Sequence, residues 1–133
     1  MSATRTEMVA SAAFTASGVS AKFSVPTAGD LIVGVDVTAA AGTPVLDLWL
    51  QASDDGGTTW YDMPFDLALK TSATATENTT RTNDRSIIDN KTSTTAEQFM
   101  ATYKRIATDT VRLKWIISGT TPSFTFSASM VAK

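Results

Sequence analysis

Residues 51–61 constrain the fold of this chain more than any other segment. They read Gln-Ala-Ser-Asp-Asp-Gly-Gly-Thr-Thr-Trp-Tyr, so two runs of strand-forming residues meet across a turn rich in aspartate and glycine. Glycine tolerates positive φ, and aspartate accepts hydrogen bonds from nearby backbone amides, so this composition is typical of a β-hairpin tip. The segment predicts a hairpin around which further strands are arranged.

Alternation of apolar and small or polar residues predicts strands before this hairpin. The run 31–37 places its leucine and valines on one face and Gly34 and Asp36 on the other. The run 45–51 directs three leucines to the core and leaves Trp49 on the opposite face. Two interpretations of Trp49 stay open: an exposed or interface aromatic, or a side chain covered by a loop.

Several more segments have strand character, and no segment shows a helical period. Further strands are expected at 19–25, 59–63, 65–71, 98–107, 110–118 and 123–131. The fold class is therefore all-β, as a two-sheet β-sandwich of about eight strands, jelly-roll-like or immunoglobulin-like. Two similar segments, 42–44 and 119–122, each link one strand to the next, which we interpret as similar turn chemistry.

The domain organisation expected from the sequence is an N-terminal arm at 1–18 and one β-sandwich domain at 19–133. The arm has few large apolar residues and contains at most a short strand near 8–15, so it is either a frayed end or a segment that docks on a neighbouring subunit. A long Ser/Thr-rich loop is expected at 71–96. Its apolar pair, Ile87 and Ile88, would pin the loop to the domain or form an added strand.

Composition disfavours catalysis. The 133 residues include no histidine and no cysteine, which removes the commonest general base, thiolate chemistry and the usual zinc ligands. With 11 basic and 13 acidic residues and no basic patch, the chain is not expected to bind nucleic acid. No apolar run is long enough to span a membrane, and the N-terminus does not resemble a signal peptide, so we expect synthesis and folding in a cytoplasm.

The hairpin also matches the Asp-box pattern Ser-x-Asp-x-Gly-x-Thr-Trp, with Ser53, Asp55, Gly57, Thr59 and Trp60 at the fixed positions. This pattern resembles the repeated hairpins of sialidases and related β-propellers, where it lies away from the catalytic centre. The chain has one copy and is too short for a propeller, so we interpret these five residues as turn-forming. A glycosidase-like enzyme is correspondingly disfavoured.

Two kinds of binding site compete with simpler interpretations. A Ca²⁺ site would use a group of carboxylates whose spacing matches no EF-hand loop, and solvated turn acids are favoured. These carboxylates are Asp54, Asp55, Asp62 and Asp66. A sugar-stacking platform would use four aromatic side chains, Trp49, Trp60, Tyr61 and Trp115. Two of them, Trp60 and Trp115, are better explained as core or turn-packing residues. No metal, cofactor or catalytic residue is predicted.

The run 46–62, Leu-Asp-Leu-Trp-Leu-Gln-Ala-Ser-Asp-Asp-Gly-Gly-Thr-Thr-Trp-Tyr-Asp, resembles small proteins from the structural modules of tailed bacteriophages. The segment 119–127, Gly-Thr-Thr-Pro-Ser-Phe-Thr-Phe-Ser, resembles them as well. The likeness covers about half of the chain, at 31–63 and 109–131, and leaves out the loop at 71–96. These motifs carry no catalytic residues. The resemblance implies a virion component, with capsid decoration favoured.

The sequence therefore predicts a non-enzymatic phage structural protein that binds the outer head surface. Its expected partners are the major capsid protein or other virion proteins and further copies of itself, within a virion assembled in the host cytoplasm. The alternative is a carbohydrate-binding or adhesion module of a fibre or tail. The arm and the long loop are the expected contact segments. Possible interaction residues are Trp49, Tyr61, Ile87 and Ile88.

Overall fold

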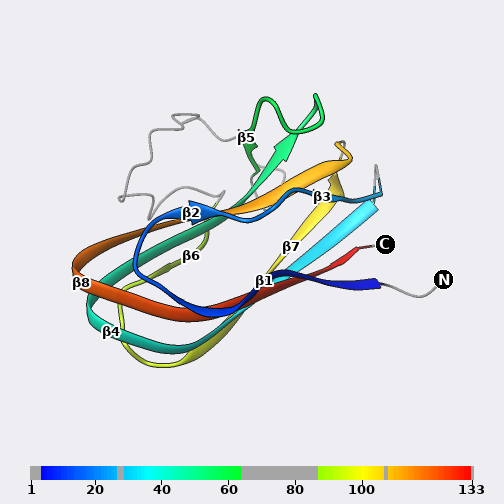
Figure 1. The fold of residues 1–133 in the computed structure, drawn as a ribbon. Helices are drawn as coiled ribbons and strands as arrows, with labels where there is room; N and C mark the ends of the chain where they lie inside the picture. Colours follow the sequence, from blue (N-terminus) through cyan, green and yellow to red (C-terminus); the bar gives the residue numbers. More distant parts are fainter. Residues whose placement is uncertain (1–3, 27–28, 64–86, 107, 133) are drawn as a thin grey trace.

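The computed structural model describes residues 4–26, 29–63, 87–106 and 108–132, which form strands and their connections (Figure 1). The strands are β1 (Thr4–Phe14), β2 (Gly18–Val19), β3 (Phe23–Ser24), β4 (Gly29–Ser53), β5 (Tyr61–Asp62), β6 (Ile87–Lys91), β7 (Glu97–Ile106) and β8 (Thr110–Ala132). All of them belong to one antiparallel sheet. The all-β fold class is confirmed.

Two long strands organise the sheet. β4 and β8 pair from Leu31 opposite Ala132 to Ser53 opposite Thr110. The first half of β4 also pairs with β7, and its second half pairs with β5 and β6. On the other side, β1 flanks the second half of β8, while β2 and β3 flank its first half. In Figure 1 both long strands turn back together at the left of the view, so the sheet folds over on itself.

The core lies between the two layers that this fold creates. Trp115, in the first half of β8, meets Phe126, in its second half, with ring centroids 5.5 Å apart. Phe14 of β1 packs on the same indole at 5.2 Å. The expected sandwich of two sheets is thus two layers of one continuous sheet, because β4 and β8 pass through both. Strand alternation predicts which side chains face inward, but it does not reveal that a strand continues through a bend.

The bend brings together the two similar segments noticed in the sequence. Thr43 pairs with Thr120, and Gly119 lies opposite Pro44. Gly42 and Gly119 have φ values of +79° and +109°. A Cβ on Gly119 would overlap the carbonyl oxygen of Thr43, and one on Gly42 would overlap backbone oxygens of the facing segment. Irregular register at Ala41/Thr43 accompanies the turn, as expected where a bulge redirects a strand.

The N-terminal segment differs from the expected arm. Residues 4–14 form β1, which pairs along its length with β8, and both Met8 and Val9 are buried. This segment is therefore a strand of the domain. Its alternation is hidden in the sequence because register shifts at Glu7/Val9 and Val9/Ala12 interrupt the pairing. Such bulges change which residues face the core.

Two other predicted segments have different outcomes. Of the loop expected at 71–96, residues 87–91 form β6 and pair with β4, which is the added strand considered from the sequence. Residues 71–86 lie outside the described part of the chain, as does the strand expected at 65–71. No helix among the described residues is long and apolar enough to cross a bilayer.

Candidate interaction surface

The outer faces of the two layers differ in exposure. On the second half of β4, Asp47 and Trp49 are 0% exposed and Gln51 is 4% exposed, although all three point away from the core leucines. This half of β4 is therefore buried on both sides. On its first half, the corresponding residues Gly34 and Asp36 are partly exposed. The accessible face is the outer face of the layer made by β1, β7, the first half of β4 and the second half of β8.

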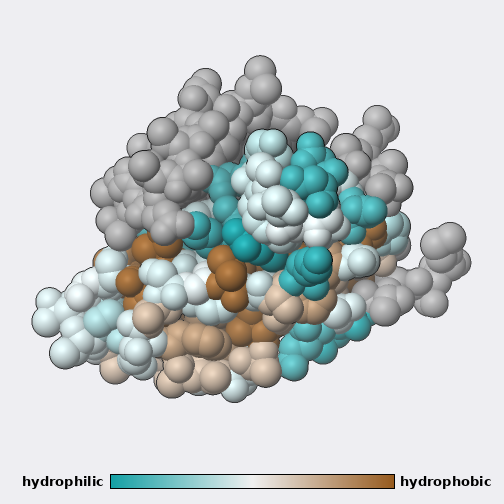
Figure 2. Space-filling model, turned by 45° about the horizontal axis from the view of Figure 1, so that its top comes forward, coloured by the Kyte–Doolittle hydropathy of each residue, from teal (hydrophilic) through white to brown (hydrophobic). Residues whose placement is uncertain are grey.

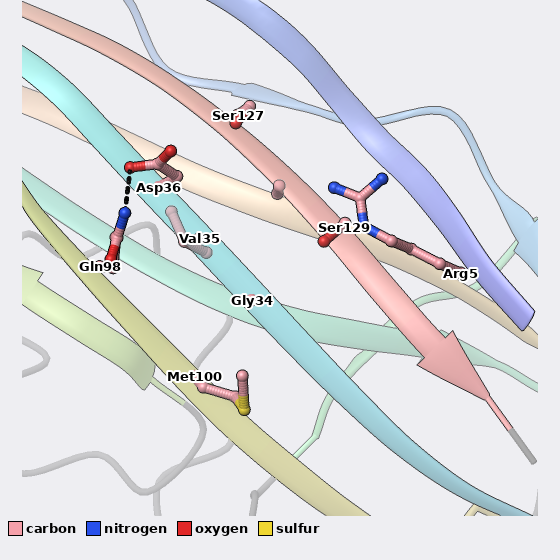
Figure 3. Close-up of a pocket in the computed structure, with 9 residues that line it drawn as sticks. Arg5, Gly34, Val35, Asp36, Gln98, Met100, Ser127 and Ser129 are labelled. Atoms are coloured by element: carbon pink, nitrogen blue, oxygen red, sulfur yellow. Dashed lines mark hydrogen bonds between the residues drawn. The ribbon is translucent and has the colours of Figure 1, made fainter. Parts of the chain in front are cut away.

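A shallow groove of about 400 Å³ crosses this open face (Figure 3). Its floor has small side chains, with Ser129 of β8 opposite Gly34 of β4 and Ser127 nearby. Met100 of β7, opposite Gly34 in register, is 70% exposed at the rim. The groove is thus a surface of mixed polar and apolar character formed by four strands, with one large apolar side chain beside it.

Opposite charges flank the groove floor. Arg5 extends from β1 toward Ser129 of β8, whereas Asp36 lies on β4 beside Gln98 of β7 (Figure 3). The amide of Gln98 donates a hydrogen bond of 3.4 Å to the Asp36 carboxylate. Sequence reasoning did not identify this groove. Its residues come from four strands that are distant in the chain, and only the pairing of these strands brings them together.

The Asp-box hairpin is organised by Ser53 and Asp55. Asp55 Oδ1 accepts from the backbone N–H groups of Thr58 and Thr59 at 3.0 and 2.8 Å, and from Ser53 Oγ at 2.7 Å. Ser53 Oγ in turn accepts from Gly57 N at 2.8 Å. The hydrogen bonds to Asp55, from the Thr59 backbone first and the Ser53 hydroxyl second, hold its pKa well below the ordinary value. The carboxylate therefore closes a turn.

Trp60 completes the hairpin by packing against the body of the sheet. Its indole Nε1 donates to Gly57 O at 3.1 Å, and the guanidinium of Arg112 lies 4.2 Å from its ring centroid. Lys22 Nζ also donates to Gly56 O at 2.9 Å. Gly57 has φ +108°, a conformation that disfavours other residues. Arg112 and Lys22 thus anchor the hairpin to the rest of the domain.

Trp49 is not a surface aromatic. Its Nε1 donates to Asp62 Oδ1 at 2.7 Å, and Gln51 Nε2 donates to the same oxygen at 2.9 Å. Arg112 Nε donates to Gln51 Oε1 at 2.8 Å, which extends the network to β8. The prediction that Trp49 contributes to an interaction surface is therefore corrected. Of the two interpretations left open, the covered side chain agrees with the structure: Trp49 faces away from the leucines, and on that side its indole bonds to Asp62.

The other predicted positions are dispersed. Tyr61 is 56% exposed, whereas Trp115 belongs to the core. The backbone of Ile87 and Ile88 lies in β6, but their side chains are outside the described residues. The described part of the chain contains no cluster of three or more potential metal-binding side chains, and Asp66 lies outside it. Figure 2 shows strongly apolar residues in small separate groups among pale and hydrophilic ones.

Comparisons with known proteins show structures with a similar fold, but they do not assign the chain to a family. No protein-family model and no curated protein sequence matches the chain. Among solved structures, it is similar to the SPBc2 prophage-derived protein YomS, with a TM-score of 0.54, 13% identity and coverage of 99% of this chain and 94% of the other. A chain from infectious bursal disease virus, Gx strain, matches with a TM-score of 0.50 and 7% identity, over 98% of this chain and 31% of the viral one. The shared fold thus occurs in proteins of a prophage and of a virus.

Proposed function

We propose that this protein is a non-enzymatic structural component of a bacteriophage particle, and that it decorates the outer surface of the head. The observation that carries the proposal is the run 46–62, which resembles phage structural-module proteins. The similarity of fold to a prophage-derived protein over nearly the whole chain supports it. The partner is the major capsid protein, and the site of action is the virion assembled in the host cytoplasm.

The mechanism is contact. A decoration protein stabilises a shell by burying surface across subunit joints, and the symmetry of the shell repeats a modest contact many times. In this chain the open face of β1, β4, β7 and β8 offers partly exposed serine, threonine and glycine with Met100 at the rim. The carboxylate of Asp55 is engaged by turn amides, which supports a structural and not a chemical role for the Asp box.

The direct test is to locate the protein on a particle. Purified protein is added to phage heads that lack it, the mixture is sedimented, and the pelleted heads are imaged by electron cryomicroscopy. Regular density on the outer head surface is expected. Protein that remains in the supernatant, or density confined to a tail, would contradict decoration. Asp54→Asn, a change at the exposed hairpin tip, serves as a folded comparison and should bind equally.

Deletion of residues 1–14 is a poor test of capsid binding. It removes all of β1, together with the buried Met8 and Val9. The deletion would destabilise the domain, and loss of binding would follow from unfolding. Point substitutions on the open face avoid this ambiguity.

The carbohydrate-binding alternative loses part of its basis. It would use Trp49, Tyr61 and the loop expected at 71–96, but Trp49 is 0% exposed and bonded to Asp62. Trp49→Ala would therefore test packing, and Tyr61→Ala is the informative variant on a glycan array. No observation among the described residues favours this function over decoration.

A further inference from the structure

We propose that the groove on the open face is a two-fold contact with a second copy of this chain, in which Arg5 of each copy pairs with Asp36 of the other. The inference rests on the groove itself and does not depend on the proposed attachment to a capsid. It assigns a partner and a geometry to the face that the fold leaves accessible.

The first argument is the placement of charge. Arg5 on β1 and Asp36 on β4 lie on opposite sides of a floor made by Gly34, Ser127 and Ser129 (Figure 3). A two-fold axis that lies in the plane of the interface, perpendicular to the line from Arg5 to Asp36, exchanges the two sides, so each cation faces an anion. In a two-fold interface residue i contacts residue j and j contacts i, which is the arrangement that these charges satisfy. A second copy of the chain therefore presents an arginine to Asp36 and an aspartate to Arg5.

The second argument is the shape and chemistry of the floor. Glycine and serine side chains are short, so they let a second sheet approach closely, and the serine hydroxyls both donate and accept across the axis. Met100, which is 70% exposed, would be covered by the facing copy. The net charge of −2 opposes association only weakly. A groove that combines charged and hydroxyl side chains with an exposed methionine suits a modest, salt-sensitive dimer.

The test uses reciprocal charge reversal in the full chain. Arg5→Glu sets a carboxylate against Asp36 of the second copy at both contacts, and Asp36→Arg sets a second guanidinium against Arg5 at both. Like charges across an interface are unfavourable, so each variant alone should dimerise at least about tenfold more weakly than the wild type. An equal mixture of the two variants should form a heterodimer, because one of its two contacts pairs the new carboxylate with the new guanidinium and the other keeps the wild-type pair. Sedimentation equilibrium and native mass spectrometry measure the masses.

A matched control separates this contact from a general effect of charge. Asp54→Arg makes the same change as Asp36→Arg, but at the exposed hairpin tip on the other layer. It should self-associate like the wild type. Raising the salt to about 1 M should weaken the wild-type dimer, because it screens exposed ion pairs. Thermal unfolding of each variant establishes that it is folded.

Three results would overturn the proposal. The wild type could stay monomeric at millimolar concentration, either single variant could associate as tightly as the wild type, or the mixture could fail to form a heterodimer. If the wild type is monomeric and both substitutions instead abolish binding to purified capsid protein, the groove belongs to a different partner. This combination, a monomeric wild type with lost capsid binding in both variants, would support the proposed function and reject the two-fold contact.

Discussion

At the scale of single residues, Asp55 shows how a short motif specifies a local structure. Its carboxylate accepts hydrogen bonds from two backbone N–H groups and from the Ser53 hydroxyl. These bonds favour the ionised form in the folded chain and lower the pKa of Asp55. A carboxyl group whose folded pKa is lowered stabilises the fold above its ordinary pKa. This stabilisation is lost as the pH falls below that value toward the lower folded pKa.

We therefore predict that Asp55 contributes to acid unfolding. The wild type should lose stability as the pH falls from about 5 to about 2, and Asp55→Asn should show a smaller loss over this range because it has no proton to bind. Urea unfolding midpoints at both ends of the range measure the effect. Asp54→Asn removes one carboxylate from the same tip and corrects for net charge. Equal acid dependence in the wild type and Asp55→Asn would contradict the role.

At the scale of elements, the bend in β4 and β8 decides the architecture. Two strands of 25 and 23 residues would extend far beyond a domain of this size if they were straight. Gly42 and Gly119 allow the turn because each combines positive φ with a backbone oxygen close to where a Cβ would lie. The bend thus requires glycine for two separate reasons, conformation and space.

Three alanine substitutions separate these reasons. Gly119→Ala would combine the unfavourable positive φ with a steric overlap against the Thr43 carbonyl oxygen. It should lower the free energy of unfolding by about 2–3 kcal/mol. Gly56 has φ +77°, but no atom lies within 4 Å of an added Cβ. Gly56→Ala should therefore lower the free energy of unfolding by about 1 kcal/mol. Gly34→Ala has neither problem, with its nearest atom, Ser129 Oγ, at 3.9 Å, and should change stability by less than about 1 kcal/mol. Equal losses for Gly119→Ala and Gly56→Ala in denaturant titrations would show that close approach at the bend is unimportant.

At the scale of the whole molecule, continuity of the long strands should couple the two layers. Each of β4 and β8 contributes to both, so unfolding of one layer would expose the core side chains of the other and leave two long strands half paired. The core is shared as well, as the contact between Trp115 and Phe126 shows. The domain is expected to unfold in one cooperative transition.

Matched core substitutions test this coupling. Leu31 lies in one layer and Leu48 in the other, and both are buried. Leu31→Ala and Leu48→Ala should each lower the free energy of unfolding by about 2–5 kcal/mol. In each variant, the circular dichroism and tryptophan fluorescence transitions should shift together. Because Trp49 and Trp115 lie in the layer of Leu48, an unshifted fluorescence transition in Leu31→Ala would show that the layers unfold separately.

The sequence by itself determined the strand character, the inward faces of the long strands and the chemistry of the hairpin. These depend on neighbours within a few residues, through alternation and through short side chains bonded to nearby amides. It also suggested a phage structural protein through the run 46–62.

Only the tertiary structure decided that β1 belongs to the sheet, that Trp49 is covered and that Arg5 and Asp36 flank one groove. These three features depend on pairing between segments far apart in the chain. In β1, the bulges also hide the alternation of apolar and polar residues. The hairpin at 51–61 remains the most informative local feature. The accessible face lies on the other layer, because the bend places the first half of β4 there, with its outer side open.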